Sequence, residues 1–335
     1  MEHLRNSHYL RKRKLSLLFC FSQYWQLSFF YFRETLKRIT LKKMTMKKQI
    51  EKIMAPPAPH LVGDGFRVHN FFPGPAGEMT RMSPFFMMDY GAKIEFPASE
   101  HQRGVGVHPH RGFETVTIAY AGKVAHHDSA GNSGIIGEGG VQWMTAASGV
   151  LHKEYHEKEF ARKGGAFQMV QLWVNLPAKD KMSQPKYQGF TAEQMGKYNL
   201  PDNGGHVDVI AGEFKGAKGA ASTFTPIHLY NLYLNKGTQL RFELPENFNT
   251  GLLVAEGEIK VNDEKNVPLD HFLLFKNSGT EITVEALCDV KVLVLSGEPI
   301  NEPLVAYGPF LMNTKAEIIQ AYDDVNSGKF GVLED

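Results

Sequence analysis

The sequence predicts an all-β protein built from two jelly-roll domains. From Met46 onward, short alternating or β-branched runs are separated by Gly, Asn and Asp residues, a pattern typical of sandwiches and barrels. The pattern occurs twice, over about residues 60–176 and 205–297, and amphipathic helical periodicity is almost missing. Two jelly rolls in one chain are an established architecture for such a repeat.

Each expected strand ends at a turn signal such as Ala121-Gly122, Pro177 or Gly212. The last two runs, 282–285 and 291–295, are expected to pair with each other around Cys288-Asp289. The expected strands are residues 113–120, 168–175, 207–210, 228–234, 252–261 (two strands about a turn at Glu256-Gly257), 282–285 and 291–295.

One helix is predicted near the C-terminus. Thr314 is placed as its N-cap, with Glu317 at the position that completes a capping box. Ile318, Ile319 and Tyr322 are expected on one face, and Gly328 is expected to end the helix.

These elements suggest four segments. Residues 1–45 form an atypical N-terminal extension, 46–186 a first β-barrel domain, 187–312 a second β-barrel domain, and 313–335 the helix and tail. The polar stretch 177–185, bracketed by prolines, is expected to be the linker between the domains.

Residues 1–45 differ in composition from the rest. A basic opening, residues 11–14, precedes an uncharged run, 15–32, and a second basic segment follows. A disordered or non-native extension is the favoured interpretation, with Met44 or Met46 as the true start. A membrane anchor or export signal and an organelle-targeting segment are the alternatives.

Charge and cysteine content exclude several functions. Residues 1–50 carry 12 Lys/Arg against 2 Asp/Glu, whereas the remaining residues carry 25 against 34. The mildly acidic body argues against direct binding of nucleic acid, which requires clustered cations. Two cysteines, Cys20 and Cys288, are too few for a disulfide framework or a thiolate metal site. This low cysteine content is compatible with a cytoplasmic protein. A membrane location is not expected.

The strongest functional signal is a pair of short motifs, His108-Pro109-His110 and His152-Lys153-Glu154. On a β-strand, positions i and i+2 point to the same face. Two such strands side by side would direct three imidazoles and one carboxylate at one point, a donor set suited to a divalent transition metal. His108, His110, His152 and Glu154 are therefore predicted to bind a metal.

Other residues near these motifs have competing interpretations. Glu114 could coordinate the metal, support a ligand histidine or pair with Arg111; the supporting role is favoured. His126 and His127 are adjacent, so at most one faces inward, and neither is predicted as a ligand. His101 and His156 are expected to be exposed or to support ligand histidines. The nearby aromatic and methionine residues are expected to pack in the core; they are Phe85, Phe86, Met87, Met88, Phe113, Trp143, Met144 and Trp173.

Longer motifs resemble the pirin family of the cupin superfamily. They are residues 108–115, 142–146, 149–154, 171–177 and 308–314, and the resemblance spans about 59–325. It implies a bicupin, with two barrels facing each other and one mononuclear iron, Fe(II), held in the first barrel by His108, His110, His152 and Glu154. Mn, Co, Ni, Cu or Zn would suit the same donors. The second domain has only His206, His228 and His271, widely spaced, and is expected to lack metal.

The resemblance implies two classes of function. The first is an oxygenase similar to quercetin 2,3-dioxygenases, with an aromatic small molecule and O₂ as substrates and Glu154 as both ligand and general base. The second is a non-catalytic regulator whose metal or redox state controls binding to a protein partner. A pocket above the metal open to a planar three-ring ligand would favour the enzyme, whereas closure by Phe113 or Met144 would favour the regulator.

Overall fold

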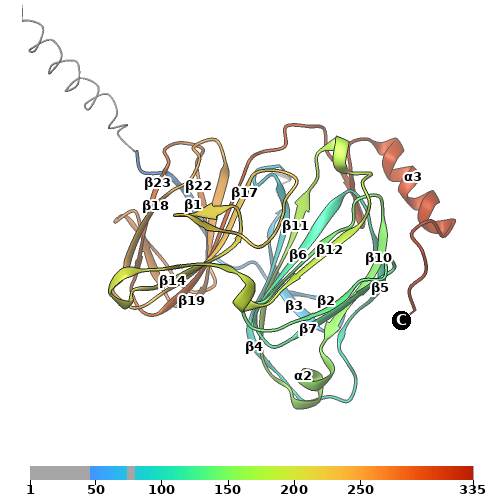
Figure 1. The fold of residues 1–335 in the computed structure, drawn as a ribbon, viewed down its shortest axis with the longest axis horizontal. Coiled ribbons are helices and arrows are strands. Elements are labelled where there is room, and N and C mark those ends of the chain that lie inside the picture. Colours follow the sequence, from blue (N-terminus) through green and yellow to red (C-terminus); the bar gives the residue numbers. More distant parts are fainter. Residues whose placement is uncertain (1–45, 74–79, 335) are drawn as a thin grey trace, which may run out of the picture. The chain divides into compact units, whose positions relative to one another are not determined.

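The computed structural model describes residues 46–73 and 80–334 of the chain. These residues form two β-barrels, each made of a large and a small antiparallel sheet, with two short α-helices (Figure 1). The three interpretations of residues 1–45 lie outside the described residues. No helix in the described part of the chain is long and apolar enough to cross a membrane.

The first barrel supplies the strands of both histidine motifs. Its large sheet has the order β12-β9-β6-β11-β4-β3-β2, and its small sheet has the order β5-β10-β7-β8. The bounds are β2 His60–Val62, β3 Phe66–Phe72, β4 Phe85–Phe96, β5 Gly104–His110, β6 Phe113–Ala121, β7 Val124–Asp128, β8 Ser133–Ile136, β9 Val141–Thr145, β10 Val150–His156, β11 Gly165–Asn175 and β12 Lys186–Phe190; α2 spans Lys158–Lys163.

The second barrel repeats this arrangement. Its large sheet has the order β1-β22-β19-β24-β17-β14-β13, and its small sheet has the order β18-β23-β20-β21. The bounds are β1 Ile50–Met54, β13 Gly196–Asn199, β14 Gly205–Ala211, β17 Ile227–Leu234, β18 Gln239–Glu243, β19 Asn249–Glu256, β20 Ile259–Val261, β21 Lys265–Val267, β22 Phe272–Phe275, β23 Glu281–Ala286 and β24 Val290–Gly297.

Shorter elements complete the fold. The hairpin strands are β15 Glu213–Phe214 with β16 Ala217–Lys218, and β25 Val305–Tyr307 with β26 Phe310–Met312. The 3₁₀ turns are η1 Ala178–Asp180, η2 Ala192–Gln194 and η3 Pro201–Asn203, and helix α3 spans Lys315–Asn326.

The all-β prediction and the expected strands are confirmed, but one expected pairing is wrong. β23 pairs with β18 and β20 in the small sheet, whereas β24 pairs with β17 and β19 in the large sheet. The two runs are consecutive, yet the chain passes from one sheet to the other at Cys288-Asp289. A local pattern predicts a strand but does not say which sheet it joins.

The strands near the expected domain boundaries show how the barrels are joined. β1 pairs with β22 of the second barrel, and β12 pairs with β9 of the first. The expected linker 177–185 joins β11 to β12, which are both strands of the first barrel, so it does not connect the two barrels. Within it Lys181 is 1% exposed, and its Nζ donates hydrogen bonds to Gly112 O, Leu311 O and Asn175 Oδ1 at 2.6–2.7 Å. Lys181 thus ties this segment to the first barrel and to β26.

Helix α3 begins where the capping box predicts. Thr314 Oγ1 accepts from Glu317 N, and the Glu317 carboxylate accepts from Thr314 N. The expected apolar face is partly wrong: Ile318 is buried, but Ile319 is 63% exposed. Ala321 and Asp324 are buried instead, because the helix packs against the β25–β26 hairpin through a face rotated by one position.

The two large sheets pack together through a shared apolar core. Strand β6 is buried almost throughout, and its alternation decides which face each residue serves. Val116, Ile118 and Tyr120 join the shared core with residues of the second barrel, while Thr117 points the other way and bonds Glu154. The same sheet therefore carries an apolar face toward the second barrel and a polar face toward the interior of the first.

Candidate metal centre

The histidine motifs lie on adjacent strands of the small sheet. β5 and β10 are antiparallel, with His152 directly opposite His108 and Val150 opposite His110. Alternation gives His108 and His110 the same face, and the pairing brings His152 to that face. His110 and His152, which are 42 positions apart in the sequence, thus lie on the same face of the sheet, as the motif spacing predicts.

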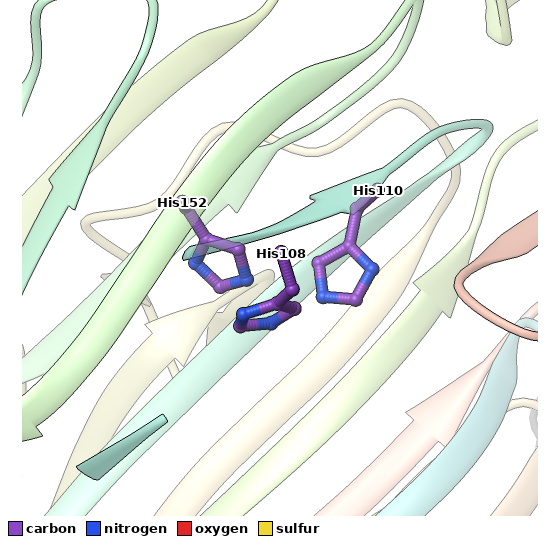
Figure 2. A group of neighbouring side chains, drawn as sticks. All are labelled: His108, His110 and His152. Atoms are coloured by element: carbon purple, nitrogen blue, oxygen red, sulfur yellow. The ribbon is translucent and has the colours of Figure 1, made fainter. Parts of the chain in front are cut away.

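The three imidazoles converge (Figure 2). Each offers a ring nitrogen, and these three nitrogens lie within 4.8 Å of one another. The ring centroids are 4.8 Å apart for His108 and His110, 4.2 Å for His108 and His152, and 4.8 Å for His110 and His152. His108 is half-buried, whereas the other two are buried, so the group is most accessible at His108.

Hydrogen bonds determine which nitrogen each ring can offer. His108 Nδ1 lies 2.8 Å from Gly106 O, and His110 Nδ1 lies 3.2 Å from Pro309 O. A carbonyl oxygen only accepts, so Nδ1 carries the hydrogen in both rings and Nε2 keeps its lone pair. His152 Nε2 is buried and has no hydrogen-bond partner. A buried polar atom without a partner is costly, and a metal bound here would satisfy it.

The charge state of these rings also suits a metal. Burial lowers the pKa of His110 well below its ordinary value, and the neighbouring His108 lowers it further. Burial likewise lowers the pKa of His152 well below its ordinary value, with His108, His110 and His126 acting in the same direction. Neutral imidazoles are the form that coordinates metal, so these residues fit a divalent transition ion.

Glu154 lies beside His152 but belongs to a different group. A Glu154 carboxylate oxygen lies within 4.8 Å of ligand atoms of His126 and His152, a set of three buried side chains. The β5–β10 register is irregular between His152 and Glu154, so that Glu154 is opposite Val105.

Three donors from the large sheet hold the Glu154 carboxylate. Gln171 Nε2 donates to Oε2 at 2.5 Å, Thr117 Oγ1 donates to Oε1 at 3.1 Å, and Gln142 Nε2 also donates to Oε1. They come from β11, β6 and β9, and each lies on the inward polar face of that sheet. The carboxylate is therefore strongly oriented within the barrel.

Sequence reasoning missed His126. It is fully buried on β7, opposite Glu154 of β10, while His127 is exposed on the other face. The alternation of adjacent histidines signals that one faces inward, but the sequence does not say which. That choice depends on the pairing of β7 with β10.

The remaining polar candidates lie elsewhere. Glu114 accepts from Thr145 Oγ1 at 2.7 Å, and burial raises the pKa of its carboxyl to about 7. It belongs to neither ligand group, and Arg111 pairs with Asp324 at 2.9 Å rather than with Glu114. Gly112, at φ 90°, lies between the end of β5 at His110 and the start of β6 at Phe113, so Glu114 is not on the strand that carries His108 and His110.

His101 and His156 have different roles. His101 is exposed and lies 3.3 Å from the Asp64 carboxylate. His156 is fully buried, which rules out the exposed alternative for this residue. Its Nε2 bonds Gly65 O at 2.8 Å, and its ring packs among phenylalanines such as Phe96 and Phe167.

Two aromatic side chains pack beside His110. Phe113 lies 4.9 Å and Trp173 lies 5.1 Å from His110, measured between ring centroids, and the two rings stack on each other at 4.2 Å. Phe113 and Met144 are 0% and 1% exposed. A cavity of about 550 Å³ lies elsewhere, on the second barrel, lined by residues that include Tyr198, Lys215 and Arg241. None of its lining residues belongs to the ligand groups.

Among the described residues, both groups of potential metal ligands lie in the first barrel. The histidines of the second barrel make other contacts. His206 stacks on Tyr233, His228 Nδ1 lies 2.6 Å from Tyr230 Oη, and His271 Nδ1 bonds a backbone carbonyl.

Comparison with known proteins identifies the family. The profile described as Pirin matches residues 65–174, and the profile described as Pirin C-terminal cupin domain matches residues 229–331. A Pseudomonas aeruginosa protein named "Putative quercetin 2,3-dioxygenase" is 46% identical over 272 residues, covering 81% of this chain and 94% of the relative. A Solanum lycopersicum pirin-like protein is 38% identical, covering 80% and 88% respectively.

Solved structures agree with this fold. The crystal structure of quercetin 2,3-dioxygenase from Acinetobacter baumannii superposes with a TM-score of 0.82 at 47% identity, covering 86% of this chain and 100% of that one. The Escherichia coli pirin YhhW, solved in complex with nickel(II), superposes with a TM-score of 0.56 at 19% identity, a likeness of fold.

Proposed function

The chain belongs to the pirin family, and from that premise we propose that it binds one divalent transition metal and cleaves flavonol-type substrates with O₂. His108, His110 and His152 are the nitrogen ligands, and Glu154 is the fourth ligand and the general base. The single observation that carries the proposal is the convergence of three imidazole nitrogens within 4.8 Å, one of them buried without a partner.

The bound metal supplies Lewis-acid chemistry that lowers the pKa of a coordinated hydroxyl group. The protein's own contribution is to bind and orient the substrate and to move a proton. Glu154 accepts the proton of the flavonol 3-hydroxyl at a carboxylate oxygen. Gln142, Gln171 and Thr117 hold that carboxylate in place, so little reorganisation is needed when the proton moves.

An aromatic side chain beside the histidines suits a planar substrate. Trp173 is only partly buried and its ring lies 5.1 Å from that of His110, and aromatic faces bind flat ring systems through offset stacking. The names of the relatives and the solved structure support a quercetin-like substrate. Iron is the proposed metal through the family, although the donors accept Mn, Co, Ni, Cu or Zn as well.

A second function, a metal-dependent regulator that binds a protein partner, has its own support. Phe113, whose ring lies 4.9 Å from that of His110, is fully buried, and Met144 is also fully buried, so neither side chain forms an open pocket wall. The exposed helix α3 is linked to the ligand strand through the buried pair Asp324–Arg111. A change at the metal could therefore reach a surface that a partner can contact.

The test is turnover by an iron-loaded sample. Protein prepared anaerobically with Fe(II) is mixed with quercetin and O₂, and the flavonol absorbance band is followed. Decay of the band in the native protein and its loss in His152→Ala, which lacks one ligand, support the enzyme. An unchanged band while iron is demonstrably bound rejects quercetin cleavage and leaves the regulator as the better proposal.

A direct metal assay tests the ligand assignment separately. His108→Ala and His152→Ala each remove one of four proposed ligands and are expected to lose most of the bound metal, whereas the exposed His101→Ala keeps it. Stoichiometric metal in both ligand variants would refute the site.

A further inference from the structure

A row of buried polar side chains continues behind His152. Strand β7 pairs with β10 so that Asp128 is opposite His152 and His126 is opposite Glu154. His126 and Asp128 are two positions apart on one strand and therefore share its inward face. Their exposed fractions are 0% and 4%, and that of His152 is 0%.

These side chains form a continuous chain of contacts. Asp128 Oδ2 lies 3.2 Å from His126 Nε2, and His126 Nδ1 lies 3.5 Å from His152 Nδ1. His152 Nε2, on the far side of its ring, is the buried nitrogen without a partner. The chain thus begins at a carboxylate and ends at the nitrogen that faces the other histidines.

The hydrogen positions along this chain follow from what each group can do. A carboxylate only accepts, so His126 Nε2 carries the hydrogen. In the neutral ring His126 Nδ1 is then an acceptor, and the hydrogen between the two imidazoles belongs to His152 Nδ1. His152 Nε2 is left with a lone pair.

We infer that Asp128 and His126 are positioning residues that hold His152 in the tautomer with Nδ1 protonated and so present Nε2 to the metal. The inference rests on the proposed metal site. In His108 and His110 the corresponding tautomer is held by hydrogen bonds from Nδ1 to backbone carbonyl oxygens. Among the three proposed histidine ligands, His152 is therefore the one whose tautomer depends on side chains that can be mutated.

Other contacts hold the side chains of Asp128 and His126 in place. Asp128 Oδ1 accepts from Ala130 N at 3.0 Å and from Asn132 N at 2.9 Å, which fixes the direction of the carboxylate. The Tyr187 ring stacks on His126 at 5.1 Å and 15°. Neither side chain has room to turn without breaking these contacts.

The anchor makes Asp128→Asn an informative substitution. The backbone donors Ala130 N and Asn132 N require an oxygen at the Oδ1 position, so the new amide nitrogen replaces Oδ2 and donates to His126 Nε2. Asn132 Nδ2, which lies 3.0 Å from Oδ2 and 3.1 Å from Oδ1 in the native protein, keeps Oδ1 as its acceptor. His126 must then carry its hydrogen on Nδ1 and donate to His152 Nδ1. His152 Nε2 becomes protonated and cannot bind metal without a rearrangement, although the shape of the site is unchanged.

A rival arrangement uses the same residues. His126, His152 and Glu154 could themselves surround a cation, since their ligand atoms lie within 4.8 Å of one another. His126 would then be a ligand, and removing it would abolish binding as completely as removing His152. The positioning role predicts a smaller effect, because outer partners of metal-binding histidines typically contribute about 10- to 100-fold in affinity.

The experiment measures the dissociation constant of Fe(II) or Zn(II) against a chromophoric chelator, together with the thermal unfolding midpoint of the metal-free proteins. Asp128→Asn and His126→Phe are expected to weaken binding by about 10- to 100-fold. His126→Gln, whose amide oxygen can accept from His152 Nδ1, is expected to recover part of that loss. The matched control His127→Gln changes the adjacent exposed histidine and should bind as the native protein does. X-ray absorption should count the same number of imidazole ligands in the native protein and in metal-saturated Asp128→Asn and His126→Gln.

Native affinity in both Asp128→Asn and His126→Phe would overturn the inference. The inference would also be overturned if His126→Phe lost metal binding as completely as His152→Ala while its unfolding midpoint stayed unchanged, and if His126→Gln bound the metal through one imidazole fewer. If His126→Phe does not fold, Asp128→Asn and His126→Gln decide the matter. Metal retention by His152→Ala would instead refute the proposed site itself, so the two failures are distinguishable.

Discussion

His110 Nδ1 donates a hydrogen bond to the carbonyl oxygen of Pro309, 199 residues later in the chain, over 3.2 Å. The same C-terminal segment supplies Leu311 O to Lys181 and Asp324 to Arg111. A proposed ligand of the first barrel is therefore oriented by residues that follow the second barrel. The C-terminal segment is part of the site's support.

The buried pair Arg111–Asp324 should hold this segment in place. Hydrogen bonds from Lys329, Gln320 and Arg111 keep the pKa of Asp324 below its usual value. A carboxyl with a depressed folded-state pKa stabilises the protein above its unfolded pKa, and this stabilisation is lost as the pH falls. Asp324→Asn should therefore lower the free energy of unfolding at pH 7. In denaturant titrations, the difference in this free energy between the native protein and the variant should become smaller toward pH 3. Asp323→Asn is the control, because Asp323 is exposed; equal effects of both substitutions would contradict the prediction.

Glu154→Gln tests the proposed base. The substitution removes the proton acceptor and places an amide nitrogen against the donors Gln142 and Gln171. Loss of a general base costs typically about 100- to 10,000-fold in rate, so kcat for quercetin should fall by that order under metal-saturated conditions. Glu159→Gln, in an exposed ion pair with Arg162, should leave kcat unchanged. Native kcat in Glu154→Gln would eliminate the base role and leave at most a role as ligand.

Lys181 should make stability depend on alkaline pH. Burial lowers the pKa of its ammonium group to about 7. Between that value and the unfolded pKa of about 10.4, the unfolded chain binds more protons, so stability rises with pH. The slope contributed by one such group approaches about 1.4 kcal/mol per pH unit.

Lys181→Met removes this contribution. The native-minus-variant difference in the free energy of unfolding should increase between pH 7.5 and 9.5, a comparison that cancels the similar contribution of Lys48, whose pKa burial lowers to about 8. At pH 7 the variant should be the less stable protein, because three buried acceptors lose their donor. A pH-independent difference would show that Lys181 keeps its charge throughout this range.

Tyr120→Phe tests the contact between the barrels. Tyr120 Oη donates to Asn231 Oδ1 at 2.7 Å, and both residues are 2% exposed. Removing the hydroxyl leaves a buried amide oxygen without its donor, which costs about 1–3 kcal/mol. Chemical denaturation should show a loss of this size, whereas Tyr307→Phe, at a tyrosine that is 67% exposed, should show almost none. A loss below about 0.5 kcal/mol would mean that the interface adapts.

Local patterns in the sequence determined much of this protein. Alternation predicted strands such as 113–120 and 168–175, and the two-residue period of a strand predicted that His108 and His110 share one face. The capping residues Thr314 and Glu317 predicted the start of α3 because their hydrogen bonds join neighbours in the chain. The motifs also identified the family, since their order and length are specific.

The tertiary structure decided what no local pattern contains. The pairing of β10 with β7 placed Glu154 opposite His126, so that its carboxylate lies within 4.8 Å of ligand atoms of His126 and His152. The pairing of β7 with β10 chose His126 rather than His127 as the inward residue. Strand pairing and long-range hydrogen bonds, such as that from His110 to Pro309, depend on which distant segments meet. The two-residue alternation of a strand is the same whichever strand lies beside it, so the sequence pattern does not determine the pairing.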